Sequence, residues 1–307
     1  MRRDYHIQDR LFQAGLRTFG LGIIALLIAI VALLMNLSWP AWKQFGLGFL
    51  TGTNWDPVAE QFGAGALIYG TVVSSLLALL IATPISVAVG LYLAEVAYTP
   101  LSKILGFLVE MLAAIPSVVY GLWGIFVLAP WLRTSVQPWL GEYFGFLPLF
   151  QGPPYGVGMM AAGIILAIMI TPTISTICRE VFKAIPRNQR EAALGLGATH
   201  WEMLRLAVLK NSRSGIFGAV ILGLGRALGE TMAVTMVIGN RPEISASLFA
   251  PSQSMASMIA NEYNEASNQI HLSSLAAVGL SLFLVSLTIN AFARIVIASN
   301  TRGAKRK

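Results

Sequence analysis

Charged residues are scarce in this 307-residue chain. They make up 11% of it, hydrophobic residues make up 56%, and the mean hydropathy is +0.69. A soluble domain usually carries about 25% charged residues, so the composition excludes a soluble globular protein and is typical of a membrane protein. The net charge of +7 does not indicate nucleic acid as a partner, because in a membrane protein the positions of the basic residues matter more than their sum.

Cysteine, clustered histidine and nucleotide-binding motifs are also lacking. Cys178 is the only cysteine, which excludes a disulfide within the chain and a cysteine-based metal site. The three histidines lie far apart, without the spacing of metal ligands. No Gly-Lys pair occurs, which excludes a Walker A loop. We therefore expect no metal, no cofactor, no catalytic residues and no ATP binding by the chain itself.

Long apolar runs are what the sequence does have. A membrane-spanning helix needs about 20 mostly apolar residues, and six stretches qualify, which predicts an all-α protein with one transmembrane domain over residues 1–307. The first stretch is longer than the apolar core of a signal peptide and no small-residue cleavage site follows it, so we expect it to be retained. The six predicted helices cover roughly residues 16–37, 66–96, 104–130, 157–178, 215–239 and 274–298.

The basic residues favour one side of this predicted bundle. Seventeen of the 21 fall at the two ends of the chain or in the loops after the second and fourth helices, and three fall on the other side. Positive residues stay on the cytoplasmic side of a membrane. Both termini and the loop 179–214 are therefore predicted to face the cytoplasm. The one basic residue left over is Arg226, inside the fifth helix.

Arg226 and Glu230 place one charge of each sign within a predicted span. A central arginine costs about 2.5–3.5 kcal/mol on insertion scales, so intramembrane ionisable residues are functional candidates. Residues four apart share a helix face, so the two side chains could neutralise each other, and Gly225 and Gly229 beside them would let another helix approach closely. One interpretation is a local ion pair that packs the bundle. The other is an anion step in a translocation path, with Glu230 holding Arg226 while no substrate is present.

The loop 179–214 is the most polar internal segment. A short helix is predicted to begin after Pro186 and to end at the Gly195 and Gly197 pair, since glycine closes helices. Thr199 and Glu202 fit a capping box that starts the next helix. Two short helices at a sharp turn would form a rigid projection suited to a groove on a partner; the alternative is a solvated loop with two helical turns.

Two further features have less specific interpretations. Pro116 lies inside the predicted third helix, where proline frees a backbone carbonyl and bends the helix; the bend could be a gate or a packing kink. The outer loop 240–273 can hold an amphipathic helix with Met255, Met258 and Tyr263 on one face. That helix would cover a pore entrance or meet a partner, or simply pack at the membrane surface.

The polar loop carries a recognisable motif. Glu191-Ala192-Ala193, three residues and Gly197 resemble the EAA loop of bacterial ABC importer permeases, although Ala207 and Lys210 depart from the Ile-x-Leu-Pro pattern that usually follows. Three further stretches are similar to the permeases of phosphate importers: residues 112–124 (LAAIPSVVYGLWG), 223–234 (GLGRALGETMAV) and 260–266 (ANEYNEA). These importers have two types of permease subunit, and the stretches resemble the type that pairs with PstA more than they resemble PstA. The similarity runs from about residue 40 to residue 298.

The resemblance implies a type I, MetI-like permease bundle in the bacterial inner membrane, with a cytoplasmic coupling helix. It implies pairing with a PstA-like second permease subunit, two copies of an ABC ATPase below and a periplasmic phosphate-binding protein above. It also implies substrate roles for Arg226 and Glu230, and ATPase coupling through the EAA motif.

Other functions remain open from the residues. An ion-gradient-driven secondary anion transporter would use Glu230, but such carriers are built from inverted repeats, and no internal repeat is visible. A permease for another oxyanion such as phosphonate would share these motifs. A regulatory scaffold that reports phosphate status could coexist with transport.

Overall fold

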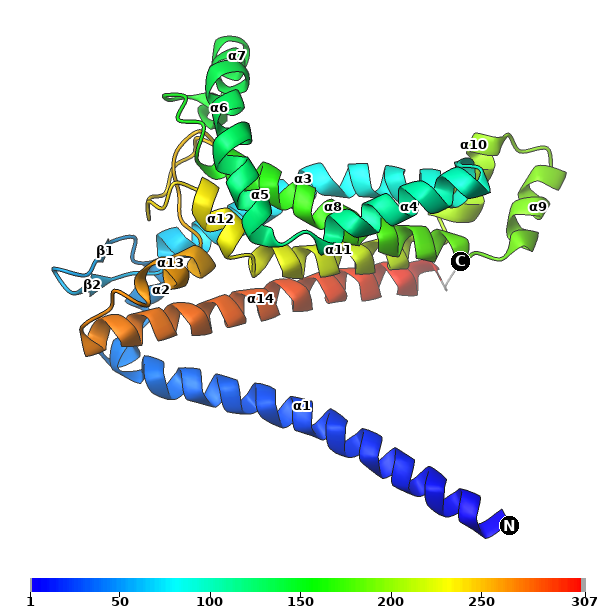
Figure 1. The fold of residues 1–307 in the computed structure, drawn as a ribbon, viewed down its shortest axis with the longest axis horizontal. Coiled ribbons are helices and arrows are strands. Elements are labelled where there is room, and N and C mark those ends of the chain that lie inside the picture. The colour runs from blue at the N-terminus through cyan, green and yellow to red at the C-terminus, as the bar shows by residue number, and fades with distance from the viewer. Residues whose placement is uncertain (1, 305–307) are drawn as a thin grey trace.

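The computed structural model describes the backbone of residues 2–304 and the side chains of Asp9 and of residues 11–295. The fold is almost entirely helical, with one two-stranded hairpin (Figure 1). The helices and strands are α1 (Arg2–Phe45), α2 (Gly48–Thr51), β1 (Trp55–Asp56), β2 (Gln61–Phe62), α3 (Gly65–Leu91), η1 (Tyr92–Val96), α4 (Thr99–Ala114), α5 (Ser117–Trp123), η2 (Gly124–Leu128), α6 (Ala129–Trp131), η3 (Leu132–Val136), α7 (Gln137–Phe144), η4 (Pro148–Phe150), α8 (Met159–Lys183), α9 (Arg187–Gly195), α10 (His200–Met203), η5 (Leu204–Leu209), α11 (Arg213–Leu228), α12 (Met232–Val237), α13 (Met255–Glu262) and α14 (Gln269–Ala304).

Five helices among the described residues are long and apolar enough to cross a membrane. They contain the predicted stretches 16–37 and 66–96 and nearly all of 157–178 and 274–298, so the prediction of an all-helical membrane protein is confirmed. The five segments are Leu11–Phe45, Gly65–Val96, Ser117–Phe144, Met159–Lys183 and Gln269–Ile295.

The predicted third helix, 104–130, is wrong as a single element. The chain leaves the helical conformation at Ile115 (ψ 128°) and Pro116 (ψ 140°), so α4 ends before Pro116 and α5 begins after it. A proline disfavours the helical conformation of the residue before it. Pro116 therefore stands at a full break and not at a bend within a helix.

The predicted fifth helix, 215–239, is also interrupted. It is divided into α11 and the six-residue α12 by Gly229, Glu230 and Thr231. The Glu230 carboxylate accepts a hydrogen bond from the backbone N–H of Ala233 at 3.3 Å, which satisfies one of the free donors in the first turn of α12. Gly229 and the bond between Glu230 and Ala233 favour the start of a new helix over the continuation of α11.

The core is built around α8, which packs against α3 and α11. Gly90 of α3 lets the two backbones approach: a Cβ there would lie 2.9 Å from the Cβ of Cys178 and 3.0 Å from the carbonyl oxygen of Ser175. Small residues at a helix contact give close packing in place of a hydrophobic driving force, which is weak within a bilayer. The central position of α8 fixes the side chains on its flanks relative to α11.

A second core lies at the end of the molecule that carries the β1–β2 hairpin and α13. Trp55 of the hairpin donates a hydrogen bond from its indole Nε1 to Glu262 Oε2 at 2.7 Å, and Nε2 of His271 lies 2.8 Å from the same oxygen. The helix predicted in the loop 240–273 is present as α13, with Met255 and Met258 buried; Tyr263, predicted on the same face, is exposed.

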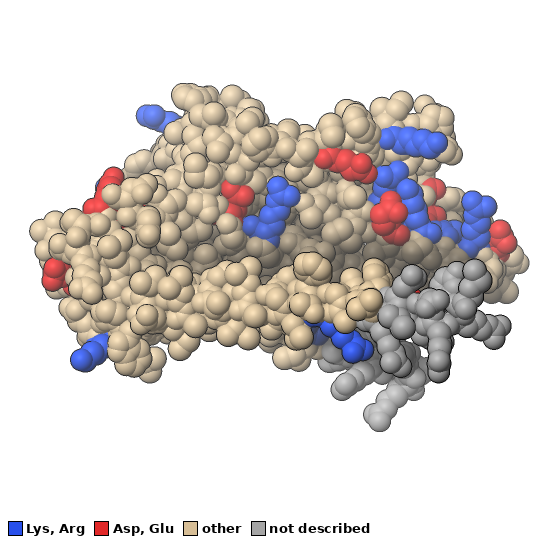
Figure 2. Space-filling model, turned by 60° about the horizontal axis from the view of Figure 1, so that its bottom comes forward, with Lys and Arg blue, Asp and Glu red and all other residues tan. Residues whose placement is uncertain are grey.

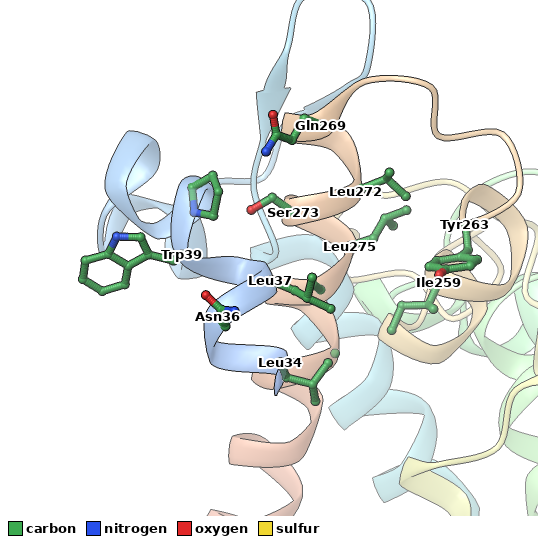
Figure 3. A pocket seen from close by; sticks show the side chains of 13 residues that line it. Leu34, Asn36, Leu37, Trp39, Ile259, Tyr263, Gln269, Leu272, Ser273 and Leu275 are labelled. Atoms are coloured by element: carbon green, nitrogen blue, oxygen red, sulfur yellow. The ribbon is translucent and has the colours of Figure 1, made fainter. Parts of the chain in front are cut away.

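Helix α1 stands apart from this bundle along most of its length. Its most apolar stretch is unburied, and Figure 1 shows it diverging from α14 toward the N-terminus. The two helices are joined near the end that carries the hairpin, where the Ala41 N–H donates to Ser273 Oγ at 2.9 Å. Figure 3 shows Leu34 and Leu37 of α1 facing a pocket of about 720 Å³ shared with α13 and α14.

Gly70 of α3 lies very close to the backbone of another segment, which gives a first prediction about stability. A Cβ on Gly70 of α3 would lie 2.0 Å from the carbonyl oxygen of Gln253, whereas one on Gly218 of α11 would meet nothing within 4 Å. We expect Gly70→Ala to lower the free energy of unfolding by about 1–3 kcal/mol, as overpacking does, while Gly218→Ala leaves it unchanged or raises it. Thermal unfolding of the purified protein in detergent checks this, and equal stability of the two variants would contradict the described contact.

Candidate functional site

Arg226 lies in the last turn of α11 and is partly buried. Its Nη1 donates a hydrogen bond to the Thr173 hydroxyl of α8 at 3.2 Å. A cation near a helix C-terminus is favoured by the helix dipole, which lowers the penalty of keeping it there. A guanidinium has five N–H donors. Because Thr173 is the one hydrogen-bond acceptor of this side chain among the described residues, donors remain for another anion or acceptor.

The expected pairing of Arg226 with Glu230 is wrong. Neither residue takes part in an ion pair of the described side chains. The i,i+4 relation holds only within one continuous helix, and α11 ends at Leu228, between the two residues. Glu230 instead caps the first turn of α12. The structure therefore leaves the cation without an internal carboxylate partner.

The break at Pro116 is closed by a side-chain hydrogen bond. The Tyr120 hydroxyl of α5 donates to the carbonyl oxygen of Leu112 at 2.7 Å, across the break. Carbonyls freed at a membrane-level break must be satisfied by neighbours, and Tyr120 does this for Leu112. Helix α5 packs against α8 and α12, the two helices that flank the segment carrying Arg226 and Glu230.

Charged side chains are unevenly spread over the surface. Figure 2 shows most charged side chains gathered toward the end with α9 and α10, and an isolated basic and acidic group in a hollow near the middle of the same face. Among the residues that the structure describes, no three His, Cys, Asp or Glu side chains are grouped as metal ligands.

The predicted helix of the polar loop is confirmed as α9. Glu191 and Ala192 are exposed, Ala193 is half-buried against the core, and Gly197 has the left-handed φ of +86° that closes the turn. The Thr199–Glu202 capping box is also present. Hydrogen bonds from the backbone N–H and hydroxyl of Thr199 hold the pKa of the Glu202 carboxyl below its usual range. This end of the molecule is therefore a rigid, exposed projection.

A buried ion pair ties this projection to the bundle. Glu95 of η1 accepts a hydrogen bond from Arg190 Nε at 3.0 Å and a second from Nη2, so the contact is bidentate. Arg190 also donates to the carbonyl oxygens of Phe182, at 2.8 Å, and Ile185. The side chains of Glu95 and Arg190 are only 8% and 16% exposed. Arg190 therefore clamps α9 to η1, which continues α3, and to the C-terminal end of α8.

This clamp was not apparent from the sequence. Glu95 is recognisable there only as a carboxylate near the end of an apolar run, and its partner lies 95 residues away. A second pair, between Glu110 Oε1 and Arg179 Nη1, is looser at 3.8 Å, and its carboxylate side chain is 54% exposed. The two pairs thus differ in tightness and burial.

Comparison with known proteins places the chain among transport proteins. Residues 86–301 match the profile of the family described as "Binding-protein-dependent transport system inner membrane component". The chain is 46% identical over 299 residues to the phosphate transport system permease protein PstC of Mesorhizobium japonicum, covering 96% of this chain and 91% of that one. It is 44% identical over 310 residues to the PstC of Pasteurella multocida, covering 100% and 97%.

One solved structure shares the fold at low sequence identity. A bacterial ABC transporter involved in the import of the acidic polysaccharide alginate aligns with 94% of this chain and 99% of its own, at a TM-score of 0.57 and 17% identity. This similarity concerns the helical arrangement only.

Proposed function

The chain belongs to the family of binding-protein-dependent transport system inner membrane components, and we propose that it forms half of the path that carries inorganic phosphate through an ATP-driven importer. It is a permease subunit of a phosphate ABC transport system, like the PstC proteins that it matches over nearly its full length. ATP hydrolysis belongs to a partner subunit. The structural observation that carries the substrate role is Arg226, a permanently charged group with unused donors inside an apolar bundle.

We propose six membrane crossings with both termini in the cytoplasm. Helices α11 and α12 together would make one interrupted crossing, and α4 with the helix Ser117–Phe144 another. Interrupted helices are tolerated at membrane depth where they line a cavity or are buried in protein. Both ends of the chain lie toward the same end as α9 and α10 (Figure 1), which supports this orientation in a bacterial inner membrane.

The other half of the path would come from a PstA-like subunit. On α11, Gly218 and Gly225 face open space: a Cβ added to either would meet nothing within 4 Å. Glycines spaced along a membrane helix let a second helix approach closely, and Leu222 between them is 60% exposed. This open face is continuous with the segment that carries Arg226, so a sister helix packed there would enclose the cation.

Coupling to ATP would run through α9. We propose that Glu191, Ala192, Ala193 and Gly197 dock in a groove of an ABC ATPase, of which two copies serve the two permeases. A periplasmic phosphate-binding protein would deliver phosphate at the outer end. Arg190 supports the coupling role because its bonds to Glu95 and to the end of α8 would pass a movement of α9 to two spanning helices.

Reconstitution tests this proposal. Vesicles containing this chain, its sister permease and the ATPase should accumulate labelled phosphate only when ATP is present on the ATPase side and the binding protein on the other. Omitting the ATPase should reduce uptake to background. Uptake that persists without the ATPase and follows an imposed ion gradient would instead show a secondary transporter. Uptake of labelled phosphonate by vesicles that do not accumulate labelled phosphate would show another oxyanion as substrate.

A further inference from the structure

A basic pocket lies at the cytoplasmic end of α11, away from Arg226. It has a volume of about 370 Å³, and its lining comes from α10, η5, the turn after η5 and the first residue of α11. Lys210 stands in that turn, at a position where the sequence departs from the usual EAA-loop pattern. The lining residues are Glu202, Arg205, Leu206, Lys210 and Arg213.

The charge in this pocket is unbalanced. Three cations face one carboxylate, and Glu202 already accepts hydrogen bonds from the Thr199 backbone N–H and hydroxyl, both at 2.8 Å. None of the three cations takes part in a hydrogen bond or ion pair with another side chain in the described part of the chain. Like charges gathered around one hollow repel each other unless an anion lies between them.

The chemistry of the cations indicates which anion. Arginine offers a planar fork of donors that matches phosphate oxygens, and lysine binds phosphate as a point charge. The pocket also lies at the first residue of α11, and the apolar side chain of Leu206 in its lining is 53% exposed. Basic pockets at the cytoplasmic ends of membrane helices bind anionic headgroups. A tetrahedral phosphate suits both the charges and the location.

We propose that Arg205, Lys210 and Arg213 form a cytoplasmic binding site for a phosphate group, distinct from the Arg226 site. The group is either the headgroup of an anionic phospholipid or inorganic phosphate on the cytoplasmic side. In the first case the site anchors the base of α11 to the inner leaflet. In the second, which rests on the proposed function, occupancy reports internal phosphate and slows transport.

The experiment uses the complete importer with the double variant Lys210→Gln/Arg213→Gln. The control is Lys103→Gln, an exposed cation elsewhere in the predicted cytoplasmic region. In the lipid arm, complexes are purified from nanodiscs containing phosphatidylglycerol, and retained lipid is counted by native mass spectrometry. In the phosphate arm, ATP-driven uptake is measured in vesicles preloaded with inorganic phosphate or with chloride.

We expect the double variant to lose at least five-fold in one arm, in retained phosphatidylglycerol or in inhibition by internal phosphate, while the control matches the unmodified complex. The arm that responds identifies the source of the phosphate group. Equal behaviour of variant and unmodified complex in both arms would overturn the proposal, and so would loss of ATPase co-purification from the variant, which would make the patch a protein contact. Lipid retention does not depend on transport, so a failure of the proposed function would be seen separately.

Discussion

Replacing Arg226 by glutamine is expected to reduce ATP-driven phosphate uptake at least about 100-fold. Hydrogen bonds to charged groups contribute about 1.5–3 kcal/mol each, and a phosphate held by two of them would lose more than two factors of ten at about 1.4 kcal/mol per factor. Assembly should be retained, because the substitution removes a costly charge from the bundle and leaves no buried carboxylate behind. Glu230 bonds to the backbone of α12 and does not pair with Arg226. The substitution therefore leaves no unpaired carboxylate, and a loss of uptake can be assigned to Arg226 itself.

The matched control is Thr173→Val, which removes the one described acceptor of Arg226 but keeps the cation. Its uptake should fall less than about ten-fold, the scale of one modest hydrogen bond. Labelled phosphate uptake and co-purification of the sister subunit check both variants. Uptake by Arg226→Gln equal to that of the unmodified importer would reject the substrate role. Intact phosphate signalling in that variant would show that a regulatory role is separable from transport.

Glu95→Gln is expected to give the second large effect, on coupling. It leaves Arg190 buried with its charge uncompensated, and breaking a buried pair in this way destabilises by about 3–5 kcal/mol. The expected result is a several-fold fall in phosphate moved per ATP hydrolysed, because α9 loses its charged link to η1 at the end of α3 and keeps only the Arg190 bonds to carbonyls at the end of α8. The readout is that ratio, measured in reconstituted vesicles.

Glu110→Gln is the control for this variant, since its pair with Arg179 is long and its carboxylate is exposed. The Glu110 carboxylate is largely solvated, although the Arg179 side chain is 12% exposed, so the loss of this loose pair should cost about 0–1 kcal/mol and leave the transport ratio unchanged. Adding Arg190→Gln to Glu95→Gln removes the uncompensated charge but also the bonds to the carbonyls of Phe182 and Ile185, so the double variant should regain stability without regaining the transport ratio. Equal ratios for Glu95→Gln and Glu110→Gln would show that the buried pair only stabilises the fold.

The elements predicted correctly were those with local causes. The helix α9 follows from Pro186 and the glycines after it, and the capping box follows from two residues three apart. The apolar runs located most of the spanning helices because span length is set by the bilayer.

The predictions that failed depended on competition between local and longer-range effects. Residues 223–234 are apolar enough to read as one helix, yet Gly229 and the cap supplied by Glu230 divide them. Pro116 was expected to bend a helix and ends one, with Tyr120 closing the gap. The Glu95–Arg190 clamp joins residues far apart in the chain, and such pairings are set only by the tertiary fold.

The clamp at Arg190 has a mechanical consequence. Helix α8 has 25 residues and is therefore about 37 Å long at 1.5 Å per residue. Because Arg190 bonds directly to the end of α8, a movement of α9 is passed to α8 without a flexible loop between them. A tilt of about 5° imposed at that end would move the other end of a straight rod of this length by about 3 Å, and Pro172 inside α8 is the point at which the helix would bend instead of tilting as a whole.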